Sequence, residues 1–224
     1  MSVVVGCTLL GASALAAPTD WTDWIAATNG NPGSALGVIT RPGSDVINVN
    51  YTGEVTFAQT TSGTDYWVPS APFTDSVVGN PPTGSDIIVL TGLGGTNTIT
   101  FSEPVTDPVL AVNSLGKVNV EVDYDFDAPF EILSQGSGYW PDGILEEAAG
   151  DVLVGHEGYG VIQFQGTFTS ISWTVSNPEY WHGFTVGLPR KGSIEPLPIP
   201  APGGLLLGAA GTLTVGYLRR RKAL

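Results

Sequence analysis

The sequence predicts an all-β protein: an antiparallel β-sandwich or jelly-roll-like domain with an N-terminal signal segment and a C-terminal hydrophobic helix. Charged residues make up only 13% of the 224 residues, whereas glycine occurs 30 times and proline 17 times. This composition favours strands and turns over helices. Many short apolar stretches, most of them separated by Gly, Pro, Asn or Ser, indicate short strands joined by turns.

Residues 1–17 form an apolar leader that ends in small residues. The sequence from Ala14 to Ala16 suits signal peptidase, and cleavage after Ala16 would leave Pro18 at the second mature position. The basic residues expected near the start of a signal peptide are missing. We expect the next segment, residues 18–191, to be the folded β-sandwich domain.

The single cysteine, Cys7, lies in the leader. A mature chain without it would have no disulfide, no cysteine-based zinc site and no thiol nucleophile. The folded domain must then be held by its hydrophobic core, which a domain of about 170 residues can supply by burying roughly 70% of its unfolded surface.

Alternating apolar and polar residues give the clearest strand signal, between Ile47 and Phe57. The pattern predicts a half-buried strand, or two strands bent at Gly53. Before it, Trp21 and Trp24 are expected to pack onto the core from a helical turn or a loose strand. Further strands are expected at residues 87–90, 98–101, 109–112, 118–126, 130–133, 152–154, 161–164, 167–175 and 184–188.

Two segments interrupt this series of strands. The run from Asp142 to Ala149 predicts one short helix, with Asp142 as its N-cap and Gly150 as its stop. Gly92-Leu-Gly-Gly95 partly matches a dinucleotide-binding fingerprint, but Asn97 replaces the third glycine and a strand pattern follows. We therefore expect a turn between two strands at this position.

The charge distribution excludes several classes of partner. The formal net charge is −13, and four of the eight basic residues lie in the last six positions, so the folded part is strongly anionic. Such a surface disfavours nucleic acid and anionic membranes. It suits solubility outside the cell and cation binding.

An acidic alternation occurs from Glu121 to Asp127, where Asp123 and Asp125 complete a set of four carboxylates at every second position. On a strand these side chains would share one face, about 7 Å apart. Two interpretations stay open: a solvated outer face, or a calcium site built from Asp123, Asp125 and Asp127. Calcium is the only cofactor that the sequence suggests.

No catalytic constellation is visible. His156 and His182 are the only histidines and lie far apart, and no Gly-x-Ser-x-Gly motif occurs. We therefore expect a protein that is not an enzyme, with a surface hydrolase as an alternative. Trp140 and Trp181, each beside a tyrosine and near Gly or Pro, are candidate carbohydrate contacts from loops; the alternative is packing over the core.

The last thirty-odd residues have the order of a sorting signal. Residues 192–202 form a proline-rich linker, in which proline takes every second position from Pro196 to Pro202. Residues 203–218 are apolar and would form a helix about 24 Å long, somewhat shorter than the ~30 Å hydrocarbon core of a bilayer. Residues 219–224 are basic and would hold the end in the cytoplasm.

This tail resembles the PEP-CTERM sorting signals of bacterial exopolysaccharide-associated proteins, including the variant with a Val-Pro-Leu-Pro-Ala type motif, also described as an ice-binding protein C-terminal motif. Pro200-Ala201-Pro202 stands where a Pro-Glu-Pro tripeptide usually falls. The tail itself implies no affinity for ice. The residues that match the signal are Pro198, Pro200, Ala201, Pro202, Gly203, Arg219, Arg220 and Arg221.

The resemblance implies recognition by an exosortase-like membrane transpeptidase and cleavage near the proline motif. The body is similar to the uncharacterised β-rich domains that carry such tails. The sequence as a whole therefore predicts an exported surface or extracellular-matrix protein, processed by signal peptidase and an exosortase-like enzyme, with exopolysaccharide as a candidate partner. The helix would lie in the membrane before processing. The alternatives are a calcium-assisted carbohydrate-binding module, a permanently anchored surface protein and a surface hydrolase.

Overall fold

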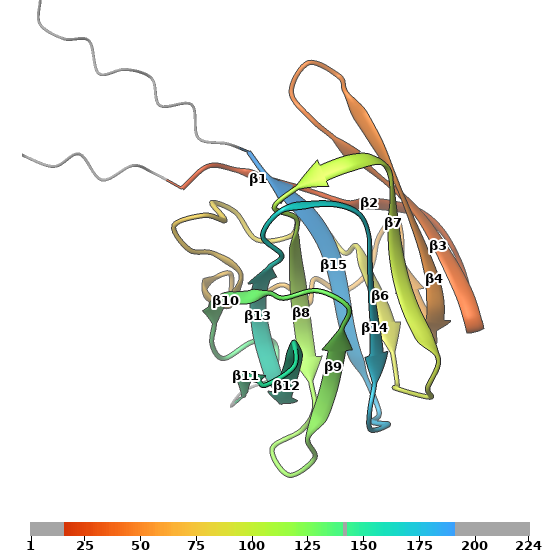
Figure 1. Ribbon diagram of the computed structural model, residues 1–224, viewed down its shortest axis with the longest axis vertical. Helices are drawn as coiled ribbons and strands as arrows, with labels where there is room; N and C mark the ends of the chain where they lie inside the picture. Colours follow the sequence, from red (N-terminus) through yellow and green to blue (C-terminus); the bar gives the residue numbers. More distant parts are fainter. Residues whose placement is uncertain (1–15, 141–142, 191–224) are drawn as a thin grey trace, which may run out of the picture. The chain divides into compact units, whose positions relative to one another are not determined.

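The computed structural model describes residues 16–140 and 143–190, which form two antiparallel β-sheets facing each other as a sandwich (Figure 1). The prediction of an all-β domain is confirmed. The first sheet contains β1 (Thr19–Trp21), β5 (Phe57–Gln59), β6 (Ile87–Leu90), β8 (Val109–Leu115), β10 (Glu131–Gln135), β13 (Gly158–Gln163) and β15 (His182–Pro189). Its order is β10-β13-β8-β15-β6-β5, with β1 also paired to β15.

The second sheet contains β2 (Asp23–Thr28), β3 (Gly30–Thr40), β4 (Val46–Val55), β7 (Thr96–Thr106), β9 (Val122–Phe126), β11 (Ile144–Ala148), β12 (Val152–His156) and β14 (Thr167–Val175). Its order is β11-β12-β9-β14-β7-β4-β3-β2. A single 3-10 turn, η1 (Ala71–Phe73), is the only helical segment in the described ranges.

The main hydrophobic core fills the space between the two sheets. Aromatic rings connect the layers there: Phe184 of β15 lies 5.1 Å edge-on from Trp173 of β14 and 5.0 Å from Tyr51 of β4. Such pairs contribute roughly 0.5–1.5 kcal/mol each beyond the burial of their surface. The alternation of apolar residues in β4 is therefore the signature of a strand with one face in this core.

A second cluster covers the outer face of the first sheet. The segment between β5 and β6 carries Trp67, Phe73 and Val78, all almost fully buried, against outward-facing residues of β6, β8 and β13. The indole Nε1 of Trp67 donates to the carbonyl of Asp86 at 3.2 Å. Because both faces of this sheet are covered, Ile87–Leu90 is an uninterrupted apolar run.

The two N-terminal tryptophans lie on opposite sides of the first sheet. Trp24 of β2 is fully buried in the main core and donates from Nε1 to Thr185 Oγ1 at 3.1 Å. Trp21 of β1 belongs to the outer cluster. The expectation that both pack onto the core from a strand is confirmed, and the helical alternative is not observed.

The predicted bend at Gly53 is displaced by three residues. β4 continues to Val55, and the chain then crosses to the first sheet through Thr56, where β5 begins at Phe57. The crossing is fixed after Gly53 because Asn97 Oδ1 accepts from the backbone N–H of Glu54 at 3.0 Å and from Tyr51 OH at 2.6 Å. This network could not be read from the alternation alone.

The short helix predicted from Asp142 to Ala149 is wrong. Ile144–Ala148 is the edge strand β11, which pairs antiparallel with β12, and Gly150 and Asp151 make the connecting turn with positive φ. Helix propensity is a weak prior beside pairing with a neighbouring strand. Burial of Leu145 in the core accompanies the strand pairing.

The two ends of the described domain meet. β1 pairs with β15, and Arg190 donates from its backbone N–H to the carbonyl of Pro18 at 2.9 Å. The Arg190 guanidinium also forms a two-pronged ion pair with Asp20, whose side chain is 6% exposed. The ion pair therefore ties the first strand of the domain to its last.

Several predictions fall on residues that the structure does not describe. These are the leader up to residue 15, the proline linker from residue 192, the helix at 203–218 and the basic tail. Within residues 16–140 and 143–190, no helix is long and apolar enough to cross a membrane.

Candidate functional site

The two tryptophans named as carbohydrate contacts come together in space. The rings of Trp140 and Trp181 lie 5.0 Å apart, edge to face at 72°. Tyr139 and Tyr66 complete an aromatic cluster, since Tyr66 lies 5.0 Å from Trp181 and 5.8 Å from Trp140. Three separate loops contribute these rings: one between β5 and β6, one between β10 and β11, and one before β15.

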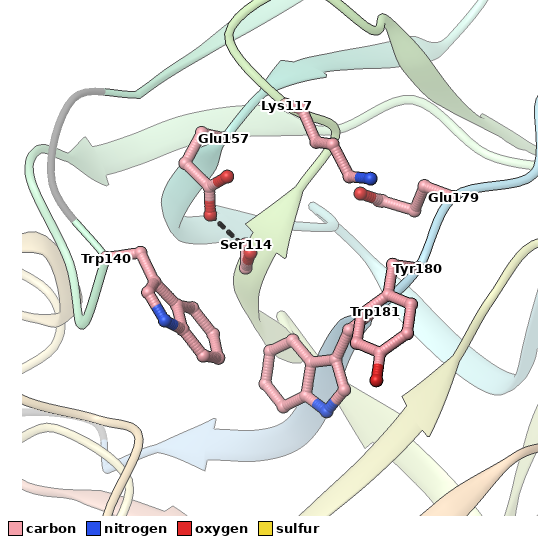
Figure 2. A pocket seen from close by; sticks show the side chains of 7 residues that line it. All are labelled: Ser114, Lys117, Trp140, Glu157, Glu179, Tyr180 and Trp181. Atoms are coloured by element: carbon pink, nitrogen blue, oxygen red, sulfur yellow. Dashed lines mark hydrogen bonds between the residues drawn. The ribbon is translucent and has the colours of Figure 1, made fainter.

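A hollow of about 260 Å³ opens beside this aromatic cluster (Figure 2). We call it the cleft. It is lined by Ser114, Lys117, Trp140, Glu157, Glu179, Tyr180 and Trp181. Trp140 is 39% exposed and Tyr180 82% exposed, so aromatic surface remains open to a ligand. Concave sites with apolar walls and a few placed polar groups are typical of binding sites for small molecules.

Glu157 forms one wall of the cleft. It has a φ of 62°, and Ser114 at the end of β8 has a φ of 57°, so both occupy the left-handed region that non-glycine residues rarely adopt. Ser114 Oγ donates to Glu157 Oε1, and Tyr159 OH donates to the same oxygen at 2.7 Å. Strained backbone of this kind persists only where its surroundings fix it, and it concentrates at functional sites.

The hydrogen bonds leave one Glu157 oxygen for a ligand. Oε2 of Glu157 makes no hydrogen bond within the described residues, and Figure 2 shows it directed across the cleft. Burial, reinforced by the bond to Glu157, raises the pKa of the Tyr159 hydroxyl, so this group stays a proton donor at neutral pH. Tyr159 OH also accepts from the backbone N–H of Trp140 at 3.2 Å, which couples this wall to the aromatic cluster.

Glu179 lies on the opposite side of the cleft, in the loop before β15 (Figure 2). Its side chain is 1% exposed. Oε1 accepts from the backbone N–H of Gly116 at 2.7 Å and lies 2.7 Å from His182 Nδ1. Because the carboxylate accepts, Nδ1 carries the hydrogen of this bond. Oε2 of Glu179 is buried without a hydrogen-bond partner in the described part of the chain.

The cleft has a negative charge balance. Among the described residues of the lining, Glu157 and Glu179 contribute two carboxylates and Lys117 is the only basic residue. Among the described residues Lys117 forms no ion pair with either carboxylate. A positively charged or hydrogen-bond-donating ligand is therefore favoured over an anionic one.

The predicted calcium residues lie elsewhere. Asp123 and Asp125 project from β9, on the outer face of the second sheet, and Asp127 follows the strand. Asp123 Oδ2 accepts from Ser176 Oγ, and Asp127 Oδ1 accepts from the backbone N–H of Ser172, each at 2.9 Å. Within residues 16–140 and 143–190, no three His, Cys, Asp or Glu side chains converge as a metal-ligand set. The calcium site stays a prediction.

The two histidines have different surroundings. His156 of β12 lies 3.8 Å from Glu121 at the surface, whereas His182 is fully buried against Glu179. A second hollow of about 520 Å³ is lined by Val118, Ser137, Gly143, Ile144 and His156. The described residues of this second hollow include no Trp, Tyr, Phe or carboxylate, so it offers less for recognition.

Several residues of this region were not predicted from the sequence, among them Glu157, Glu179 and Tyr66. Glu157 stands alone between two strands, and nothing in its neighbours signals its left-handed backbone. Glu179 directly precedes the Tyr180-Trp181 pair, and this adjacency was the available signal. Tyr66 reaches the aromatic cluster from a segment more than seventy residues before Trp140, a contact that only the fold creates.

The predicted sorting residues, from Pro198 to Gly203 and from Arg219 to Arg221, lie outside the described residues. Comparison with known proteins found no matching family model, no similar curated protein and no similar solved structure.

Proposed function

We propose that this chain is an exported surface or extracellular-matrix protein whose β-sandwich binds carbohydrate in the cleft beside Trp140 and Trp181. The observation that carries the proposal is the convergence of these two rings, from loops about forty residues apart, beside a hollow walled by carboxylates. Exopolysaccharide is the partner that fits both the cleft and the predicted destination.

The physical basis is the match between a sugar and the cleft lining. A sugar ring presents an apolar face of C–H groups and a rim of hydroxyls. Partly exposed tryptophans offer flat apolar surface for the face. The free Glu157 oxygen accepts hydrogen bonds from the rim, and charge-assisted bonds of this kind are stronger than neutral ones.

The same geometry favours binding over hydrolysis. A glycosidase needs two carboxyl groups that both reach the scissile bond. The Glu179 side chain is 1% exposed, and its bonded oxygen is occupied by Gly116 and His182. Glu157 is the carboxylate with an oxygen open to a ligand. Turnover of soluble polysaccharides would support the hydrolase alternative instead.

A binding assay with matched variants tests the proposal. We expect the full chain to bind at least one polysaccharide in a panel by affinity electrophoresis or calorimetry. Trp140→Ala and Trp181→Ala should each weaken binding about tenfold or more, since losing roughly 1.4 kcal/mol of contact is a tenfold change. Leu36→Ala, which removes an exposed apolar residue on β3, serves as the control and should bind as the parent does.

The same assay with EDTA separates the calcium-assisted alternative. Loss of binding on chelation, together with loss in an Asp123→Asn variant, would assign the recognition to Asp123, Asp125 and Asp127. Binding that is unaffected by EDTA but lost in Trp181→Ala would support the cleft. Absence of binding to every polysaccharide in both conditions would overturn the proposal.

Export and sorting are the second part of the proposal. Within residues 16–140 and 143–190, the first strand begins at Thr19, shortly after the predicted cleavage site at Ala16, and the last ends at Pro189, shortly before the proline linker. Removal of both flanking segments would therefore spare every strand pairing of the two sheets. This supports a removable leader and a removable tail.

Intact mass of the protein recovered from the cell exterior tests this part. We expect the leader to be absent and the chain to end between about residues 196 and 203, as processing by an exosortase-like enzyme requires. A C-terminus at Leu224 would contradict processing, and a full-length tail in the membrane fraction would support the permanent-anchor alternative.

A further inference from the structure

We propose that the cleft selects a sugar that carries a free amino group. The inference rests on the proposed carbohydrate binding and specifies its substrate class. It places the ammonium of the sugar on Glu157 Oε2 and the sugar ring against Trp140 and Trp181 (Figure 2). The residues of the cleft supply three separate reasons.

The first reason is the chemistry of the open oxygen. Glu157 Oε1 already accepts from Ser114 and Tyr159, so the carboxylate is held in place by its own structure. Oε2 can only accept, and it carries a charge. An ammonium offers both a hydrogen-bond donor and the opposite charge, whereas a sugar hydroxyl offers the donor alone.

The second reason is the unpartnered oxygen of Glu179. Its other oxygen, Oε1, accepts from the Gly116 N–H and lies 2.7 Å from His182 Nδ1. Oε2 is buried in the cleft wall without a partner. A buried carboxylate is screened less by salt than an exposed one, so it lowers the electrostatic potential of the cleft without touching the ligand.

The third reason is the aromatic lining. Cations are attracted to the faces of tryptophan and tyrosine rings within about 6 Å, most strongly where water is displaced. Trp140, Trp181 and Tyr180 all line the cleft. The same rings that hold an apolar sugar face therefore also favour a neighbouring positive charge. Uronic acids and sulfated sugars are disfavoured by both carboxylates.

Lys117 opposes this preference. It is the one basic side chain of the lining and is free of ion pairs with the described residues. Its ammonium repels that of the ligand. Removing it should therefore strengthen binding of an amino sugar, which is an effect that a purely structural role would not produce.

The test compares short oligosaccharides of one length and three chemistries by calorimetry: a glucosamine tetramer, its N-acetylated form and a glucose tetramer. We expect the glucosamine tetramer to bind at least about tenfold more tightly than either of the others. Glu157→Gln should abolish this preference while keeping weak binding of the neutral sugars. Glu179→Gln should reduce it several-fold, and Lys117→Met should increase it several-fold.

A control is needed because the whole domain is anionic and attracts cations without a site. Asp125→Asn removes one carboxylate from the exposed outer face of β9 and changes the net charge as Glu157→Gln does. We expect Asp125→Asn to keep the preference. If Asp125→Asn lowers it as much as Glu157→Gln does, the attraction is general and the inference fails.

The outcomes also separate this inference from the proposed function. Equal or tighter binding of the N-acetylated or glucose tetramer, still dependent on Trp181, would overturn the amino-sugar preference and leave carbohydrate binding standing. Equal affinity for choline would show that an ammonium alone is recognised and would also overturn it. Absence of binding by all oligosaccharides and polysaccharides would remove both proposals together.

Discussion

Glu54 and Glu179 are two buried carboxylates that the fold treats differently. Glu54 is 2% exposed and accepts from the Thr56 hydroxyl at 3.0 Å, from the backbone N–H and the hydroxyl of Thr91 at 3.0 and 2.5 Å, and from the Leu93 N–H at 2.9 Å. The Glu179 side chain is 1% exposed, but one of its oxygens has no partner in the described part of the chain. Thr91 links the two, since its carbonyl accepts from the Glu179 N–H at 2.8 Å.

Their different hydrogen bonding indicates that Glu54 is the carboxylate that maintains the structure. The turn from Gly92 to Gly95 resembles a phosphate-binding loop in sequence, and in the folded chain it presents the Leu93 N–H to the protein's own Glu54. Burial alone would raise the pKa of Glu54. The hydrogen bonds from Thr91, Leu93 and Thr56 outweigh this effect and hold the pKa below its ordinary value. Glu54 therefore secures the crossing between sheets. One oxygen of Glu179 has no partner among the described residues, so we expect this carboxylate to contribute less to stability than Glu54 does.

Replacing each of the two glutamates by glutamine tests this difference. The largest effect on stability is expected at Glu54. An amide has one acceptor oxygen, so Glu54→Gln leaves part of the donor set facing an NH₂ group. We expect a loss of about 2–3 kcal/mol in the free energy of unfolding. Urea unfolding monitored by tryptophan fluorescence measures it. Glu131→Gln, at an exposed carboxylate, should change stability by less than about 0.5 kcal/mol.

Asp86 differs from Glu54 because its pKa is raised and not lowered. Burial, with a contribution from the nearby Asp23, raises the pKa of Asp86 to about 6. Between its ordinary value near 4 and pH 6, the folded state binds a proton that the unfolded state does not, so this group lowers stability as the pH rises through that window. Because Asp86 is partly exposed and solvent screens the effect, Asp86→Asn should stabilise the protein at pH 7 by only about 1 kcal/mol.

The pH dependence of stability distinguishes Glu54 from Asp86. For Glu54, whose folded pKa is lowered, the stabilisation is present above its ordinary value of 4.5 and is lost as the pH falls through the lowered pKa. Urea unfolding at pH 4, 5, 6 and 7 should show that Asp86→Asn removes part of a fall in stability toward pH 7. A profile unchanged by Asp86→Asn would contradict this assignment.

A smaller effect on stability than at Glu54 is expected at Glu179. Glu179→Gln keeps an acceptor oxygen for Gly116 and His182 and removes a buried charge that has an unpartnered oxygen. We expect the free energy of unfolding to change by less than about 1 kcal/mol. A loss as large as that of Glu54→Gln would show that both carboxylates maintain the structure, and would remove the distinction between them.

The fold class was predictable because alternation and turn residues record local geometry. The single buried face of β4 appears in the sequence as alternation, and the two covered faces of β6 appear as an unbroken apolar run. The strand at Ile144–Ala148 leaves no such pattern in the sequence, because its five residues of mixed propensity adopt the conformation that pairing with β12 imposes. The crossing at Thr56 follows contacts that Asn97 makes with Tyr51 and Glu54, which no local pattern records.

The site was predictable only in its aromatic part. Trp140 and Trp181 were named because large aromatics beside turn residues suggest exposed loops. The fold creates the rest of the site. It brings these two rings together, places Tyr66 beside them from another loop, and gives Ser114 and Glu157 their left-handed backbone. The acidic alternation around Asp125 was conspicuous in sequence but lies on an outer face.

Indole N–H signals in a two-dimensional NMR spectrum test the central claim most directly, because the chain's six tryptophans include their own controls. On titration with a binding oligosaccharide, the account predicts that the resonances of Trp140 and Trp181 shift, whereas those of Trp24 and Trp173, buried between the sheets, stay in place. Assignment follows from the corresponding Trp→Phe variants. Binding that leaves Trp140 and Trp181 unmoved would place the sugar elsewhere and contradict the account.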